Sequence, residues 1–263
     1  ERFSFFQDKF SNLDKIVETE LNPRAIIFDL GLSSFQIEDL KRGFSFESAG
    51  FLSMEMGINN YSAYDVVNTL DEKYLSSIIK NLGDEKDGKF IAKKIVKCRA
   101  KRPIKTSKEL ASIISEAKKN YNNYKKNPAT KTFQAIRIFV NHELTELIQG
   151  LIKATKILKN NGILIVVSFH SLEDKIVKYF FKSLSENESI SRYVPKLDQP
   201  KILFDLKEKK PITPSDKELK ENLHSRSAKL RYVIKKRDFY EFKTDIEKKF
   251  KKFLEIENFS NKL

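Results

Sequence analysis

Two short runs made almost entirely of apolar residues form the strongest pattern in the chain. Residues 25–28 read AIIF and end at Asp29, and residues 163–169 read ILIVVSF and end at His170. Short apolar runs with β-branched residues are typical of strands that are buried on both faces of a parallel sheet. Helical periodicity precedes and follows these runs, so the pattern predicts a doubly wound α/β fold.

The N-terminal residues predict one further strand and a helix. Residues 1–10, ERFSFFQDKF, alternate so that Phe3 and Phe5 share one face of a strand. Ser11 followed by Asp14 predicts a capping box at the start of a helix, which Asn22-Pro23 ends before the first apolar run.

The pattern changes between residues 47 and 126 to short amphipathic helices without a convincing strand. We predict these helices over residues 61–68, 72–81, 86–99 and 107–121. An all-helical block between two sheet strands is typical of an insertion domain. The predicted domains are therefore residues 1–46 and 127–263, forming one α/β domain, with residues 47–126 inserted.

The second half of the chain predicts helix, strand and helix in turn. Apolar residues at helical spacing predict one long helix from Pro128 to Leu158, which residues 160–162, Asn-Asn-Gly, end as a glycine C-cap. After the second apolar run, Ser171 with Asp174 predicts a capping box that opens a further helix.

The C-terminal third predicts a long connection, a strand and a last helix. Residues 182–225 are charged, contain four prolines and lack periodicity. Residues 225–235 alternate as a strand, and residues 242–254 have the spacing of an amphipathic helix.

Composition narrows the class of protein. A hydrophobic content of 40% supports a real core, and no stretch approaches the roughly 18 apolar residues of a membrane helix, so we expect a soluble protein. The single Cys98 excludes an internal disulfide framework, and the scattered His142, His170 and His224 predict no metal site. A reducing cytoplasm is the expected location.

The charge favours a polyanionic partner. Lys and Arg number 50 against 36 Asp and Glu, a formal net charge of +14. Residues 89–105 hold eight basic groups and no acid, and the lysines of the predicted helix share one face. This stripe is either a track for RNA phosphates or an ordinary solvated helix face. The predicted RNA-binding residues are Lys89, Lys93, Lys97, Lys101 and Arg102.

Polar residues follow both apolar runs, which is where chemistry is expected. Ligands of open α/β sheets bind beyond the carboxyl ends of the strands. The candidate catalytic residues are therefore Asp29, Ser33, Ser34, His170 and Ser171. Two alternatives remain open, because Asp29 also has the spacing to cap the next helical turn, and a lone His170 also suits a structural hydrogen bond.

Three segments in order carry a resemblance to a known family. They are FDLGLSSFQIEDLKRGFSF (28–46), NPATKTFQAIRIFVNHEL (127–144) and ILIVVSFHSLEDKIVK (163–178). They resemble the small-subunit ribosomal RNA methyltransferase H family, which uses S-adenosylmethionine to methylate the N4 amine of a cytidine in the 16S decoding region. The resemblance spans about residues 1–237. It implies a Rossmann-like methyltransferase domain with an RNA-binding helical insertion, and the small ribosomal subunit as partner.

The resemblance also implies a cofactor site. Phe10, Asp29 and Gln36 match family positions that contact S-adenosylmethionine. Phe10 is expected to stack on the adenine, with core packing as the alternative, and Asp29 and Gln36 to form hydrogen bonds. No metal is required. The family's first strand and glycine-rich turn lie ahead of this point, and none of the eight glycines here forms G-x-G, so we expect that half of the site to be absent.

The chain departs from the family pattern at several positions. Residues 51–57 read FLSMEMG where the family favours PLDMRMD, Phe35 replaces a usual proline, and residues 223–224 replace Pro-Arg. These departures suit a rival interpretation, a non-enzymatic RNA-binding protein with a degenerate methyltransferase fold. A second rival is an amino methyltransferase acting on DNA or protein, whose usual Asp/Asn-Pro-Pro-aromatic run is absent.

Overall fold

The computed structural model describes residues 3–17, 23–57, 59–118, 127–186, 202–237, 242 and 244–263. The chain folds into two compact units. The sheet unit comprises residues 1–31 and 146–250, and the helical unit comprises residues 32–145 and 251–263. None of the described helices has the length and hydropathy needed to cross a lipid bilayer. The division into domains at residues 46 and 126 stays a prediction.

The sheet unit is built on four strands in the order β1-β2-β4-β3. β1 (Ala25–Asp29) pairs in parallel with β2 (Ile163–Ser168). β2 pairs antiparallel with β4 (Lys229–Lys235), which pairs antiparallel with the short β3 (Phe204–Asp205). The two apolar runs are therefore parallel neighbours, and the predicted α/β class is confirmed.

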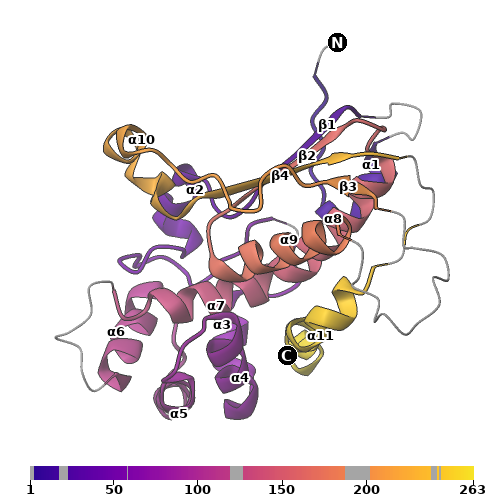
Figure 1. Ribbon diagram of the computed structural model, residues 1–263. Coiled ribbons are helices and arrows are strands. Elements are labelled where there is room, and N and C mark those ends of the chain that lie inside the picture. Colours follow the sequence, from indigo (N-terminus) through magenta and orange to yellow (C-terminus); the bar gives the residue numbers. More distant parts are fainter. Residues whose placement is uncertain are drawn as a thin grey trace. The chain divides into compact units, whose positions relative to one another are not determined.

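Two helices cover one face of this sheet (Figure 1). They are α9 (Ser171–Ser183) and α8 (Glu143–Ile157), most of which lies in the sheet unit. A Cβ added at Gly150 of α8 would meet the Phe28 ring at 3.3 Å, so this glycine lets the helix approach β1 closely. Burial of β1 on both faces was predicted and is wrong, because Ile27 on the opposite face is 64% exposed.

The predicted N-terminal strand and cap are also wrong. Residues 3–9 have no regular structure, and Phe3 is 78% exposed. Ser11 lies inside the 3-10 helix η1 (Phe10–Asn12), which leads into α1 (Leu13–Ile16). The Ser11 backbone N–H and hydroxyl donate to the Glu146 carboxylate of α8 at 2.9 and 3.2 Å, so this serine serves a tertiary contact. The helix predicted to run to Asn22 already ends at Ile16, because Val17 has an extended backbone.

The helical unit confirms the four helices predicted within the insertion. Their apolar stripes pack together, as in α4, whose buried residues are Leu75, Ile78, Ile79 and Leu82. The last of these four helices ends at Ala117 and not at the predicted residue 121, because Lys118 has an extended backbone. The helices of this unit are α2 (Ser34–Glu38), η3 (Leu40–Arg42), α3 (Ala63–Thr69), α4 (Glu72–Leu82), α5 (Gly88–Arg99), α6 (Ser107–Ala117) and α7 (Thr130–Asn141).

The single long helix predicted up to Leu158 is two helices. α7 ends at Asn141 and α8 begins at Glu143, because His142 between them has a left-handed backbone with φ of 51°. After α8 the left-handed residue is Asn161 with φ of 60°, so the predicted glycine C-cap is also wrong. Histidine and asparagine are among the side chains that tolerate this conformation best.

The connection after α9 contains more structure than predicted. Besides β3 it holds α10 (Asp216–Glu221) and the 3-10 helix η5 (Leu223–Ser227), which delays the start of the last strand to Lys229. Residues 187–201 lie outside the described residues. The buried Lys235 ammonium of β4 donates to the carbonyls of Thr155 and Leu158 at 2.9 and 2.7 Å, which satisfies the C-terminal end of α8.

The C-terminal residues complete the helical unit. α11 (Ile246–Glu257) and η6 (Asn258–Lys262) bring Glu257 to the first N–H groups of α8. The Glu257 carboxylate accepts from the backbone N–H of Leu144 at 3.0 Å and of Thr145 at 2.9 Å, and from the Thr145 hydroxyl. Burial raises the pKa of Glu257 to about 8. The Phe259 ring packs against Tyr74 of α4 at a centroid distance of 4.8 Å.

Candidate functional site

Asp29 stands at the carboxyl edge of the sheet. Its register partner is Val167 of β2, and His170 follows β2 by two residues, so both candidates lie at one edge. Asp29 does not cap the next helix, because Ser33 is the N-cap of α2. The Asp29 side chain is exposed, and among the described residues no hydrogen-bond or ion-pair partner is found for its carboxylate. An exposed acid without a structural partner is available to a ligand.

The Phe10 ring lies in the sheet unit with one part packed and one part open. It meets the Phe28 ring edge-on at a centroid distance of 5.1 Å. A Cβ added at Gly150 would lie 3.0 Å from the Phe10 Cβ, so α8 holds this residue closely. Phe10 nevertheless remains 39% exposed. Phe10 can therefore both pack in the core and stack on a ligand, because the contacts on its packed side fix the orientation of the exposed part of the ring.

Ser33, Ser34 and Gln36 belong to the helical unit, at the start of α2. The Ser33 hydroxyl accepts from the Gln36 backbone N–H, and the Gln36 side-chain oxygen accepts from the Ser33 backbone N–H at 3.0 Å, which forms a capping box. The Gln36 oxygen is used locally, which leaves its amide N–H groups for a ligand. Ser34 is exposed in the first turn of the helix.

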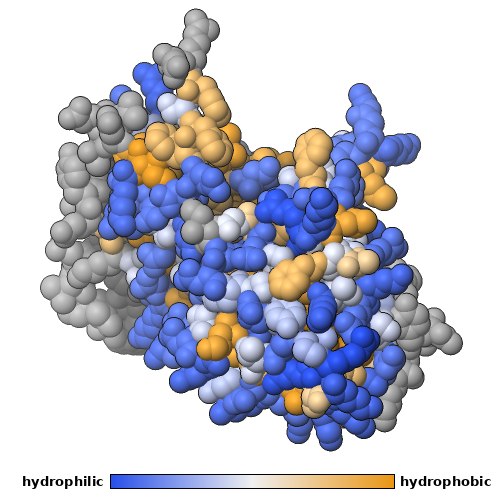
Figure 2. Space-filling model, turned by 180° about the vertical axis from the view of Figure 1, so that it is seen from behind, coloured by the Kyte–Doolittle hydropathy of each residue, from blue (hydrophilic) through white to orange (hydrophobic). Residues whose placement is uncertain are grey.

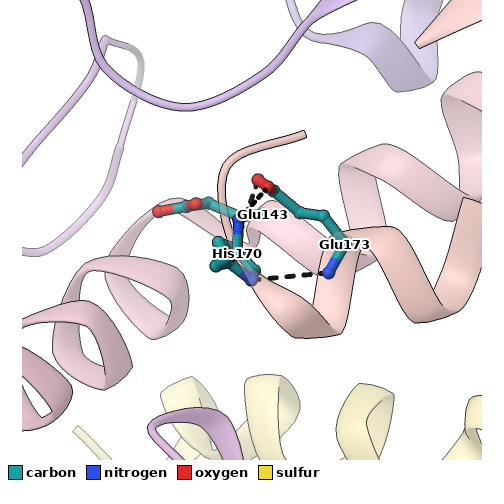
Figure 3. A group of neighbouring side chains, drawn as sticks. All are labelled: Glu143, His170 and Glu173. Atoms are coloured by element: carbon teal, nitrogen blue, oxygen red, sulfur yellow. Dashed lines mark hydrogen bonds and ion pairs between the residues drawn. The ribbon is translucent and has the colours of Figure 1, made fainter. Parts of the chain in front are cut away.

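His170 is committed to the start of α9 (Figure 3). The Glu173 backbone N–H donates to His170 Nδ1 at 3.4 Å, and the Glu173 carboxylate accepts from the backbone N–H groups of Phe169 and His170 at 2.9 and 3.2 Å. His170 Nε2 lies 3.1 Å from Glu173 Oε1, with both side chains less than 10% exposed. The capping box predicted for Ser171 and Asp174 is therefore wrong by one residue, and Ser171 is exposed.

Asp174 instead joins α9 to β4. Its carboxylate accepts from Arg231 Nε at 2.7 Å and from Lys229 Nζ at 3.1 Å. Burial opposes ionisation, yet the hydrogen bonds from these two cations hold the pKa of Asp174 below its usual range. The Arg231 side chain is only 7% exposed, and its Nη1 donates to the Lys209 carbonyl at 3.0 Å. The guanidinium is thus fixed beneath the surface of the sheet unit.

The basic stripe of the helical unit is exposed as predicted. Lys89, Lys93 and Lys97 project from α5, and no acidic partner is found for them among the described residues. Lys94, which lies beside them, pairs with Glu116 at 2.8 Å. Figure 2 presents a largely hydrophilic face with scattered hydrophobic side chains.

A groove of about 940 Å³ adjoins the end of α5 and the start of α6. Lys101 and Arg102 line it together with Lys105 and Lys108. Arg102 also pairs with Glu109 at 2.8 Å, although its own side chain is 78% exposed. The two predicted residues at this end of the stripe therefore belong to a concave basic surface.

Comparison with known proteins decides the family. A family model described as the MraW methylase family matches residues 1–237. The chain belongs to that family. Proteins named "Ribosomal RNA small subunit methyltransferase H" are similar to it at 45% identity in Sulfurihydrogenibium sp. (88% of this chain, 75% of that protein) and at 46% in Ehrlichia chaffeensis (88% and 76%). The predicted Rossmann-like methyltransferase fold is therefore confirmed.

The segment that departs from the family pattern is held through its backbone groups. The Asn141 side-chain oxygen accepts from the Met56 N–H and from Asn59, both at 2.8 Å. Its amide donates to the carbonyls of Met54 at 2.9 Å and Arg137 at 2.8 Å. One side chain of α7 thus fixes both sides of the loop at Glu55.

The sequence did not predict the roles of three residues, Phe90, Asn141 and Arg231. Phe90 is 63% exposed on α5 and lies three residues before Lys93, so exposed aromatic surface accompanies the stripe. The spacing of Phe90 from the lysines could have predicted that it shares their exposed face. Asn141 and Arg231 gave no such signal, because an amide and a cation are ordinarily read as surface groups.

Proposed function

We propose that this protein uses S-adenosylmethionine to methylate the N4 amine of a cytidine in the decoding region of small-subunit ribosomal RNA. The names of its relatives support ribosomal RNA as the substrate. The observation that carries the cofactor assignment is the exposed carboxylate of Asp29, the last residue of the parallel strand β1, which has no structural partner among the described residues.

The residues at the sheet edge have the chemistry that a nucleoside cofactor needs. The exposed side of Phe10 offers an apolar face for an adenine ring, and the Asp29 carboxylate accepts hydrogen bonds from hydroxyl or amine groups. In the helical unit, Gln36 offers the N–H groups of its side-chain amide as neutral donors, for which no acceptor is found among the described residues. When bound, S-adenosylmethionine supplies an electrophilic methyl group on a sulfonium.

The protein's task in this reaction is chiefly alignment. The N4 amine of cytosine is a weak nucleophile because its lone pair is conjugated into the ring. Residues that hold the amine in line with the methyl group, and that accept one of its hydrogens, supply the rate enhancement. Asp29, Ser33, Ser34 and Ser171 remain the candidate acceptors. His170 is better suited to positioning, because its ring caps α9.

The helical unit supplies the proposed RNA contacts. Lys89, Lys93 and Lys97 present a basic track that has no acidic partner within the described part of the chain, and Lys101 and Arg102 continue it into the groove. The adjoining exposed Phe90 offers a face for base stacking. Phosphate contacts with stacking surfaces are typical of proteins that bind unpaired RNA.

The experiment replaces one exposed carboxylate at a time. Small-subunit RNA from cells lacking the gene is analysed by mass spectrometry, and the gene is restored as wild type, Asp29→Asn or Asp84→Asn. Asp84 is the matched control, since its side chain is 90% exposed and asparagine tolerates its positive φ of 49°. We expect one N4-methyl group to be lost in the deletion, and to return with wild type and Asp84→Asn alone.

Calorimetry on purified protein measures how much cofactor affinity the Asp29 carboxylate contributes. A hydrogen bond to a charged group contributes about 1.5–3 kcal/mol, so Asp29→Asn should lower cofactor affinity about 10- to 150-fold in calorimetry. Full methylation by Asp29→Asn would contradict the residue assignment. A methyl group that persists in the deletion strain would contradict the substrate and favour a non-enzymatic RNA-binding protein.

A further inference from the structure

A second basic hollow lies in the sheet unit, separate from the stripe on α5. It encloses about 320 Å³ between the C-terminal half of α9 and the segment that follows β3. Five of its eight lining residues are basic and one is acidic. The basic residues are Lys178, Lys182, Lys209, Lys210 and Arg231.

Arg231 forms the fixed part of this hollow. Its Nε and Nη1 donate to Asp174 and to the Lys209 carbonyl, so the guanidinium cannot swing away. The Lys209 backbone is held by the same contact, which places the neighbouring Lys209 and Lys210 side chains at the rim. A buried, oriented guanidinium flanked by exposed ammonium groups is suited to a tetrahedral oxyanion, because its remaining N–H donors are already aligned.

The single acid does not neutralise the hollow. Glu186 is 43% exposed and approaches Lys182 at 3.6 Å and Lys209 at 3.9 Å, distances at which a surface ion pair contributes little. Lys178 and Lys210 have no acidic partner among the described residues. The positive charge therefore remains available to an anion from solution.

We propose that this hollow binds a backbone phosphate of the RNA substrate, at a nucleotide other than the one that is methylated. The inference rests on the proposed function for the identity of the RNA. Arg231 pairs with Val166, and Asp29 pairs with Val167, so the two residues lie two strands apart. Strand spacing of about 4.8 Å places them about 10 Å apart in the sheet, on opposite faces.

The separation explains why the hollow addresses another nucleotide. Asp29 shares the open face with the exposed Ile27, whereas Arg231 shares the helix-covered face with Phe28. A nucleotide with its base at Asp29 would have to cross two strands, as well as change face, to place its own phosphate in the hollow. A folded RNA segment longer than the target nucleotide is needed to occupy both positions.

The test removes the two rim lysines that have no acidic partner. The variant is Lys178→Ser with Lys210→Ser, and the matched control is Lys175→Ser with Lys220→Ser. The control residues are exposed, lie on the same helix and the same connection, and do not line the hollow. Binding of a transcript of the decoding region is measured by fluorescence anisotropy at several salt concentrations, and thermal unfolding checks that all proteins are folded.

We expect the hollow variant to bind with a salt slope shallower by about one to two units, because each phosphate contact to a single strand contributes about 0.7. One unit means a fourfold smaller loss of affinity between about 50 and about 200 mM salt. The control should keep the wild-type slope. Equal changes of the salt slope in both double variants would overturn the site, because they would show that RNA binding depends only on the total positive charge of the protein.

A free phosphate is the other source of the same chemistry. Inorganic phosphate and pyrophosphate are titrated into wild type and the hollow variant by calorimetry. If they bind wild type alone while the RNA slope is unchanged, the RNA assignment is overturned. Methylation of cellular RNA is read separately, so loss of the proposed function and loss of this phosphate contact give different results. An unchanged slope with normal methylation refutes only the hollow.

Discussion

Neutralising Glu257 should remove a pH dependence from the stability of the protein. In the unfolded chain this carboxyl ionises near its ordinary pKa of 4.5, whereas burial raises its pKa to about 8 in the fold. Between these values the unfolded state has lost the proton and the folded state retains it. Raising the pH therefore lowers the free energy of unfolding, by about 1.4 kcal/mol per pH unit. The stability that Glu257 contributes by retaining its proton is complete below pH 4.5 and is lost by about pH 8.

The variant Glu257→Gln isolates this effect. Glutamine places an NH₂ group where the Thr145 N–H now finds an acceptor, which should cost about 1–3 kcal/mol at every pH. Wild type should thus be more stable at pH 5. Its advantage should shrink by about 4 kcal/mol between pH 5 and pH 8, so that the variant is as stable or more stable at pH 8.

Urea denaturation followed by circular dichroism at four pH values measures the difference directly, because other titrating groups cancel between the two proteins. The control is Glu255→Gln on the same helix, whose carboxylate is 59% exposed and pairs with Lys251. Its difference from wild type should not vary with pH. A constant difference for Glu257→Gln as well would refute the reasoning, and would mean that the N–H groups of α8 keep the buried carboxylate ionised.

Three further substitutions test other parts of the molecule. Gly150→Ala should push against Phe10 and weaken cofactor binding several-fold in calorimetry with little loss of fold, since the new methyl group meets the Phe10 Cβ at 3.0 Å. Asn141→Leu should lower the free energy of unfolding by about 2–5 kcal/mol in urea, because the Met54 and Met56 backbone groups lose their partner. Reversing charge at Lys93 and Lys97 should reduce the salt slope of RNA binding by about one unit per lost phosphate contact. The matched control reverses two exposed lysines at the same spacing on α11, Lys248 and Lys252.

The sequence predicted those elements whose burial repeats with a local period. β2 and the four insertion helices carry apolar residues at spacings that match the structure, as in the buried stripe of α4. β1 was located correctly, although the face that carries Ile27 is exposed. The carboxyl edge followed from the same reasoning, because Asp29 and His170 each end an apolar run.

The predictions failed where a distant contact decides the local structure. Ser11 has the spacing of a cap, yet it bonds to Glu146, 135 residues away in the sequence. At the start of α9, two overlapping capping patterns compete, and the backbone places His170 rather than Ser171 at the cap. Arg231 is buried because Asp174 neutralises it from another element. Nothing local in the sequence distinguishes it from a surface arginine.

The loop that Asn141 holds bears on how this family tolerates sequence change. The anchoring groups are the carbonyl of Met54 and the N–H of Met56, and Arg42 also bonds to the carbonyls of Glu55 and Met56. Every residue type except proline offers these main-chain groups. The course of the chain at Glu55 therefore does not depend on the Glu55 side chain. Leu52 and Met54 are buried in the core, so within residues 51–57 charge and size are free to vary at the exposed Phe51 and at Glu55 while the loop keeps its course.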